Sequence, residues 1–222
     1  MAVPPEIQTF AATVGVEPDE IQREMQRRGE ETEFPTIGPE LGGWLYVLAR
    51  LTNARRVFEF GSGFGYSAYW FCRAVPADGE VVLTEVDAAE LEAAREYLDR
   101  GGFGDIAAFE LGDAIDTIDA YDGPFDVVLI DNEKRRYREA FEAVRPKIAA
   151  GGVVIADNAI VGPHDFEAVH DLVVGEASGD ERTTASGIAE YVRAVRADPD
   201  FESAVLPLGE GAIVSHNSGE TT

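Results

Sequence analysis

The sequence is poor in cysteine and contains no long apolar run. Its single cysteine, Cys72, excludes a disulfide framework and any metal site built from several cysteines. No apolar stretch reaches the roughly 18 residues that a membrane-spanning helix needs. The opening residues also lack the basic flank and apolar core of a secretion signal. We therefore expect a soluble, cytoplasmic protein without a membrane partner.

Basic residues are scarce beside acidic ones. The 222 residues include 18 Lys and Arg against 42 Asp and Glu, which gives a formal net charge of −24. Only Lys134 and Lys147 are lysines. Such an acidic surface repels nucleic acids, so we expect no nucleic-acid partner. Many acids with few lysines are typical of halophilic proteins, whose self-repulsion is screened by high salt; an acidic mesophilic enzyme is the alternative.

Alternating strands and helices fill most of the chain. The pattern predicts an N-terminal helical extension over residues 1–34, one α/β domain over 35–216 and a frayed tail over 217–222. Near-continuous Val and Ile runs indicate strands that are covered on both faces, hence a mostly parallel, doubly wound sheet. We expect strands at 56–60, 80–86, 107–111, 125–130 and 153–156, helices at 40–51, 66–75, 88–100, 135–149 and 187–197, and a closing antiparallel hairpin over 203–216.

Three glycines follow the first strand at every second position. Gly61, Gly63 and Gly65 allow a tight turn and the close approach of a ligand to the backbone, ahead of a helix whose free N–H groups can bind an anion. Their spacing differs from the G-x-G-x-x-G dinucleotide fingerprint. Glu59, two residues before, would repel a pyrophosphate but suits a cationic amine. The alternative is a tight turn without a ligand.

Acidic residues also follow the next two strands. Glu85 lies about 20 residues beyond Gly65, the interval expected for a carboxylate that binds a ribose diol. Asp87 competes for that role, although it also suits the N-cap of the following helix. Asp113 and Ala114 follow the third strand. Together these residues predict a nucleoside pocket at the carboxyl edge of the sheet.

Two further strands end in possible cation ligands. Asp131 ends the fourth strand, and Asp157 and Asn158 end the fifth. Carboxylate and amide oxygens suit Mg²⁺. Lys134 follows Asp131 by three residues and can face the same site. The alternatives are a capped loop at 157–158 and a solvated lysine at a helix start.

These motifs together resemble the cation-dependent class I O-methyltransferases, the family of catechol and caffeoyl-CoA O-methyltransferases. The resemblance runs from Phe34 to Ser215 and is carried by the stretches FPTIGPELGGWLYVLARLTNARRVFEFGSGFGYSAYW, LTEVD, GDA, FDVVLIDNEKRRY, GGVVIADN and ADPDFESAVLPLGEGAIVS. It implies a Rossmann-like methyltransferase fold with a seven-stranded sheet, S-adenosylmethionine as donor, Mg²⁺ or another divalent cation, a small catechol-like acceptor and a homodimer.

The resemblance also implies roles for individual residues. The donor-binding set would be Glu59, Gly61, Gly63, Gly65, Ser67, Glu85, Val86, Asp113, Ala114 and Asp131. The metal ligands would be Asp131, Asp157 and Asn158, and the catalytic base would be Lys134. A cation bound by two vicinal oxygens would lower the pKa of the acceptor hydroxyl and orient it.

Some residues depart from the family pattern. Asn132-Glu133 replaces the usual Ala-Asp, and no aromatic residue follows Asn158 closely. The connection over 162–187 is long and carries His164 and His170, which we expect to be surface residues rather than metal ligands. The acceptor therefore stays open. The other hypotheses are a metal-independent methyltransferase, a nicotinamide-dependent oxidoreductase and a non-catalytic nucleoside-binding protein.

Overall fold

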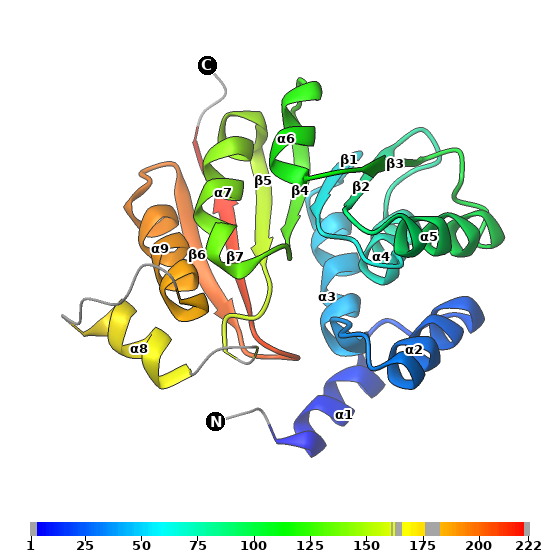
Figure 1. Ribbon diagram of the computed structural model, residues 1–222, viewed down its shortest axis with the longest axis horizontal. Helices are drawn as coiled ribbons and strands as arrows, with labels where there is room; N and C mark the ends of the chain where they lie inside the picture. Colours follow the sequence, from blue (N-terminus) through cyan, green and yellow to red (C-terminus); the bar gives the residue numbers. More distant parts are fainter. Residues whose placement is uncertain (1–3, 161, 163–165, 176–182, 220–222) are drawn as a thin grey trace.

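The computed structural model describes residues 4–160, 162, 166–175 and 183–219. Within them, seven strands form one sheet in the order β3-β2-β1-β4-β5-β7-β6 (Figure 1). The parallel strands are β1 (Arg56–Phe60), β2 (Glu80–Glu85), β3 (Ala107–Leu111), β4 (Phe125–Ile130) and β5 (Ile148–Ala156). The hairpin strands β6 (Phe201–Leu206) and β7 (Ala212–Asn217) are antiparallel. The predicted doubly wound sheet with a closing hairpin is confirmed.

Helices cover both faces of the sheet because alternate strand residues point to opposite sides. Val57 and Val127 pack in one apolar cluster with α3 (Gly38–Leu51), α4 (Tyr66–Ala74) and α5 (Ala88–Arg100). Phe58 and Val128 pack in a second cluster with α7 (Tyr137–Val144) and α9 (Thr184–Ala197). The short α6 (Ala114–Thr117) lies on this second face. With both faces buried, the strands carry the continuous apolar runs seen in the sequence.

Two helices form the N-terminal segment, which we expected to be helical. They are α1 (Pro5–Val14) and α2 (Glu20–Thr32). The α2 N-terminus is a capping box, because Asp19 accepts from the Gln22 backbone while the Gln22 side chain accepts from the Asp19 backbone. Figure 1 shows both helices on the side of α3 and α4, and Met25 of α2 is buried in the cluster on that face. The segment from α2 to α3 is thereby brought to the edge of the sheet.

The predicted helix over 135–149 is wrong at both ends. A 3-10 turn (Lys134–Arg136) precedes α7, and α7 ends at Val144. A second 3-10 turn (Arg145–Lys147) follows, and β5 already begins at Ile148. Pro146 explains the early stop, because proline has no N–H to donate to the helix and disfavours helical backbone before it. Gly151 and Gly152 thus lie inside β5 and do not end a helix.

The region after β5 contains a helix that was not predicted. Helix α8 (Phe166–Val174) lies where we expected a connection without regular structure. The next helix, α9, begins three residues earlier than predicted because the Thr183 side chain caps it by accepting from the Ser186 backbone N–H, 3.1 Å away. The polar sequence of residues 175–187 predicts a loop, and residues 176–182 of this stretch lie outside the described residues.

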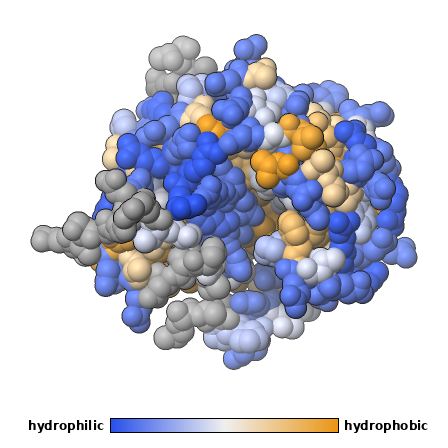
Figure 2. Space-filling view, viewed as in Figure 1, coloured by the Kyte–Doolittle hydropathy of each residue, from blue (hydrophilic) through white to orange (hydrophobic). Residues whose placement is uncertain are grey.

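The surface reflects the acidic composition. Hydrophilic residues cover most of the face shown in Figure 2, where apolar residues form only separate patches. Among the described residues, no helix has the length and apolar character needed to cross a membrane.

Candidate functional site

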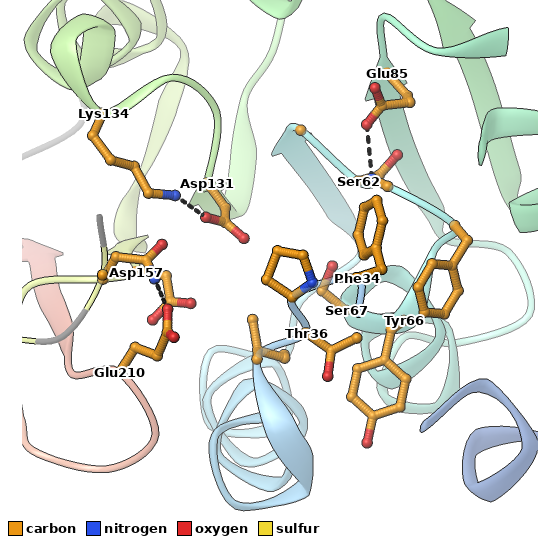
Figure 3. A pocket seen from close by; sticks show the side chains of 17 residues that line it. Phe34, Thr36, Ser62, Tyr66, Ser67, Glu85, Asp131, Lys134, Asp157 and Glu210 are labelled. Carbon is orange, nitrogen blue, oxygen red and sulfur yellow. Dashed lines mark hydrogen bonds and ion pairs between the residues drawn. The ribbon is translucent and has the colours of Figure 1, made fainter. Parts of the chain in front are cut away.

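A pocket of about 370 Å³ opens at the carboxyl edge of the central strands. Its lining residues come from the β1–α4 turn, the ends of β2, β4 and β5, the α2–α3 connection and the β6–β7 hairpin (Figure 3). They are Phe34, Pro35, Thr36, Ile37, Gly61, Ser62, Gly63, Phe64, Tyr66, Ser67, Glu85, Asp131, Lys134, Asp157, Asn158, Gly162 and Glu210. The strand order places this pocket where β1 and β4 are neighbours, the switch point at which doubly wound sheets bind ligands.

The glycine turn after β1 is packed closely against other parts of the protein. A Cβ on Gly61 would lie 2.9 Å from the Asp131 backbone oxygen, and one on Gly63 would lie 2.7 Å from the ring of Phe34. Both glycines also have positive φ angles, 84° and 50°. Gly65 is different: it forms the N-terminal cap of α4, packs against α5 and does not line the pocket. The turn therefore brings β1, β4 and the α2–α3 connection together.

Glu59 is a buried carboxyl group beside the turn. Its side chain is fully buried, and neither carboxyl oxygen has a hydrogen-bond partner of ordinary geometry. Burial raises the pKa of Glu59 to about 8; the nearby Ser67 hydroxyl lowers it in part, and the negative charge of Asp131 raises it further. Glu59 does not itself line the pocket, but it lies beside Ser67, which does. A buried carboxyl group with so few partners suits a cationic group of a ligand.

Asp131 and Asp157 bring two carboxyl groups to one wall of the pocket (Figure 3). The pKa of each is raised, mainly by burial, and for Asp157 also by the negative charge of Asp131. One oxygen of Asp157, Oδ1, is shielded from solvent and has no hydrogen-bond partner. Asn158, which follows directly, lines the same wall and is 6% exposed. Asp131, Asp157 and Asn158 therefore lie in one pocket, as the strand pattern predicts.

Lys134 lies on the same wall. Its Nζ donates to Asp131 Oδ1 at 2.6 Å, and the lysine side chain is 15% exposed. The Tyr137 hydroxyl lies 3.5 Å from the same Asp131 oxygen and 3.3 Å from the Asp157 backbone oxygen, so it links the ends of β4 and β5. The 3-10 turn before α7 thus holds the lysine over the two carboxyl groups.

Glu210 at the tip of the β6–β7 hairpin completes this acidic wall. It belongs to the Gly209-Glu210-Gly211 turn of the predicted closing hairpin, yet it lines the pocket and accepts a hydrogen bond from Asn158 Nδ2. Its pKa is raised by burial and by Asp131. No local sequence signal marks it, because it is 52 residues from Asn158 in the chain.

The opposite wall is largely apolar and was also missed. It is formed by Phe34, Pro35, Thr36 and Ile37 between α2 and α3, with Tyr66 from α4 beside them (Figure 3). Phe34 contacts Phe64 edge to face, with ring centroids 5.2 Å apart. The pocket therefore has one charged and one apolar side.

The remaining predicted donor residues lie at or beyond the edge of this pocket. Glu85 lines it, and its carboxylate accepts from the Gly63 backbone N–H at 2.9 Å. Val86 is 74% exposed just after β2. Asp113 caps α6 and pairs with Arg136, and Ala114 is buried, so neither lines the pocket. Asp87 caps α5, which confirms the alternative interpretation of this residue as a helix N-cap.

The oxygen atoms that the acidic wall presents are suitable ligands for a divalent cation. The described residues contain no group of three or more His, Cys, Asp or Glu side chains placed around a common metal position. The candidate ligands are instead two carboxylates and one amide, all hard oxygen donors. The unpartnered Asp157 Oδ1 and the mutual repulsion of the carboxyl groups favour a cation there. His170 is on α8 beside Asp171, away from this wall, and His164 lies outside the described residues.

Comparison with known proteins identifies the family. The family model described as O-methyltransferase matches residues 15–217. The chain is 32% identical over 162 residues to catechol O-methyltransferase of Mycobacterium tuberculosis, covering 72% of this chain and 74% of that protein. It is 33% identical over 129 residues to catechol O-methyltransferase of Niastella koreensis, and this match spans 56% of this chain but only 58% of that relative.

The fold agrees with this assignment. The O-methyltransferase TomG of Streptomyces achromogenes, solved in complex with SAM, superposes with a TM-score of 0.82 at 24% identity, and the match covers 96% of each chain. The sheet order, the pocket at its switch point and the extent of the family match lead to one conclusion: this chain belongs to the O-methyltransferase family.

Proposed function

We propose that this protein transfers a methyl group from S-adenosylmethionine to a hydroxyl of a small, catechol-like acceptor with the help of a divalent cation. One observation carries the proposal: the partly exposed carboxyl group of Asp131 and the buried one of Asp157 share a pocket wall with Lys134, and Asp131 lies close to the buried Glu59. The relatives named catechol O-methyltransferase and the TomG complex with SAM support the acceptor class and the donor.

The donor would occupy the part of the pocket next to the glycine turn. S-adenosylmethionine supplies an electrophilic methyl group on a sulfonium centre. The free carboxyl of Glu59 would pair with the amino group of its methionine part, and Glu85 would accept from a ribose hydroxyl. Val86 and Leu111, 74% and 60% exposed at the paired ends of β2 and β3, offer an apolar ledge for the adenine.

The acceptor would lie between the two walls. Asp131, Asp157 and Asn158 would hold a divalent cation, which supplies a lower hydroxyl pKa and a fixed orientation for two vicinal oxygens. The apolar side of Phe34 to Ile37 would contact the aromatic ring. This chain then has two tasks: to align donor and acceptor, and to remove the hydroxyl proton.

Lys134 is placed for the second task. Its Nζ reaches into the pocket on the acidic wall, 2.6 Å from Asp131 Oδ1. In the loaded site Asp131 would bind the cation, and the Lys134 ammonium group, no longer paired with Asp131, would release a proton to solvent. The neutral amine would then accept the proton of the acceptor hydroxyl. The ion pair with Asp131 also keeps the lysine oriented before the ligands arrive.

A metal-independent methyltransferase with another acceptor is the second candidate. It is favoured by the same Lys134–Asp131 ion pair, because an ammonium group already neutralises one of the two carboxylates. In that case the acidic wall would bind a cationic or hydrogen-bonding acceptor directly.

A methyl-transfer assay separates the candidates. The protein is incubated with S-adenosylmethionine and a panel of catechols, monophenols and amines, with Mg²⁺ or with EDTA. We expect methylation of catechols only, abolished by EDTA and restored by Mg²⁺. Turnover that EDTA leaves unchanged would instead establish the metal-independent reaction.

Replacing Lys134 tests its role as the base. Lys134→Met should lower kcat by about 10²- to 10⁴-fold, the usual contribution of general-base catalysis, while S-adenosylhomocysteine affinity stays within about threefold of wild type. Calorimetry supplies the binding control. Full turnover in this variant would show that the lysine has only a structural role.

A further inference from the structure

We infer that Glu210 is a positioning residue that orients the side-chain amide of Asn158, so that its oxygen rather than its nitrogen faces the cation. This inference rests on the proposed function, because it assigns a task within the same metal site. Glu210 reaches the site from the tip of the β6–β7 hairpin, far from the motifs that carry the family resemblance at β4 and β5.

The orientation of an asparagine amide is not fixed by its shape. Its oxygen and nitrogen differ only in whether they accept or donate hydrogen bonds. Asn158 Nδ2 donates to Glu210 Oε2, and an ionised carboxylate can only accept. The contact therefore holds the nitrogen towards the hairpin and leaves Oδ1 for the pocket. A reversed amide would present N–H groups to a cation and would be repelled.

The backbone around this contact is fixed by the same hairpin. The Ile160 N–H donates to the Glu210 backbone oxygen at 3.0 Å, and the Ala159 N–H donates to the Gly211 backbone oxygen at 2.6 Å. Asn158 itself has a positive φ of 57°, a conformation that asparagine tolerates better than most residues. The hairpin thus clamps the segment after Asp157 through its backbone and sets the Asn158 amide through its side chain.

Glu210 also makes the wall more negative. Its carboxylate interacts electrostatically with Asp131 and Asp157. Without a cation these three groups repel one another, and the positive charge of Lys134 offsets the repulsion and the burial of Glu210 only in part. The charge of Glu210 therefore does not stabilise the metal-free protein. A residue that served only the stability of the fold would not be expected to add a third negative charge at this position. The arrangement becomes favourable when a doubly positive ion is bound.

Binding of Mn²⁺, measured by electron paramagnetic resonance without any methyl acceptor, tests the inference. We expect Glu210→Ala to weaken Mn²⁺ binding about 10- to 100-fold, the usual effect of removing a group that orients a metal ligand. The affinity for S-adenosylhomocysteine should change by less than about threefold. Glu202→Gln, at an exposed position on the same hairpin, is the matched control and should bind Mn²⁺ like the wild type.

A double-mutant cycle isolates orientation from charge. Glu210→Gln removes the charge and lets the side chain donate as well as accept hydrogen bonds. It can then pair with either Nδ2 or Oδ1 of Asn158, so the orientation of the Asn158 amide is no longer fixed. In an Asn158→Asp background residue 158 has two equivalent oxygens and needs no orientation. We therefore expect Glu210→Gln to weaken Mn²⁺ binding at least tenfold in the wild-type background and less than threefold in the Asn158→Asp background.

The outcomes are distinguishable. Equal losses in the two backgrounds, or an unchanged affinity in Glu210→Ala, would overturn the orienting role and leave the proposed function intact. Wild-type protein that binds no Mn²⁺ would overturn the metal-dependent function together with this inference. The thermal midpoint in EDTA adds a separate readout: it should be equal or higher in Glu210→Gln than in wild type, and a marked fall would indicate a structural role instead.

Discussion

At the scale of single residues, we predict that the buried carboxyl of Glu59 makes ligand binding sensitive to pH. Its pKa of about 8 means that the group is protonated at pH 6 to 7 in the free protein. A cationic amino group favours the carboxylate, so binding must release this proton. The affinity for S-adenosylhomocysteine should rise with pH from 6 to 8, by up to about tenfold per unit, and then level off.

Calorimetry of Glu59→Gln against wild type checks this expectation. The variant cannot release the proton, so its affinity should be lower and nearly constant over the same pH range. Parallel pH profiles for the two proteins would show that Glu59 does not pair with the ligand.

Single residues could be predicted from the sequence where they adjoin a strand end. Asp131, Asp157 and Asn158 come together because parallel strands end at the same edge, which the strand pattern already implies. Phe34 and Glu210 were missed because they enter from connections whose course depends on tertiary packing. No local rule places an α2–α3 connection or a hairpin tip over a particular strand.

At the scale of elements, the hairpin tip is the part whose packing shapes the pocket. A Cβ on Gly211 would lie 2.5 Å from Cγ1 of Ile160, and Gly211 has a φ of 83°. Gly151 has a similar φ of 77°, but a Cβ there would meet nothing within 4 Å. Both Gly→Ala variants should therefore lose about 1 kcal/mol from backbone strain. Gly211→Ala should lose about 1–3 kcal/mol more from the clash.

Urea unfolding of the two variants measures the difference directly, since the shared backbone strain cancels. Gly211→Ala should also weaken Mn²⁺ binding, because a displaced tip moves Glu210 away from Asn158. Equal free energies of unfolding in the two variants would mean that the hairpin tip accommodates the added Cβ at residue 211 without loss of stability.

The elements were predictable to the extent that their limits are set locally. Helix α5 ends at Arg100 as the following glycines indicate, and α2 begins at a capping box. The helix predicted over 135–149 is wrong because Pro146 ends it early, although the apolar spacing of a helix continues beyond it. Gly151 does not follow a helix but lies within β5 at a positive φ. Glycine pairs can end a helix or interrupt a strand, and only the pairing of β4 with β5 decides between them.

At the scale of the whole molecule, the net charge of −24 is the main electrostatic feature. Several arginines form ion pairs, yet acidic residues remain in large excess. We propose that salt stabilises the fold by screening this repulsion, since the Debye length falls from about 10 Å at 0.1 M to about 3 Å at 1 M. The thermal midpoint should rise between 0.1 M and 2 M KCl.

A variant with three fewer negative charges separates screening from other effects of salt. Glu31, Glu96 and Asp105 are exposed, and replacing them with Gln, Gln and Asn removes three negative charges. The triple variant should melt higher than wild type in 0.1 M KCl and at the same temperature in 2 M KCl. A wild-type midpoint that does not rise with KCl would contradict the proposal.

The two walls of the pocket come from distant parts of the chain, and this has a consequence for protein synthesis. Phe34 leaves the ribosome before Glu210, which is far behind it in the chain. A nascent polypeptide that already contains the glycine turn, Asp131 and Asp157 still lacks the hairpin tip. If the proposed donor and cation bind only the native site, they stabilise it by mass action. They could then assist folding only after the hairpin tip has emerged.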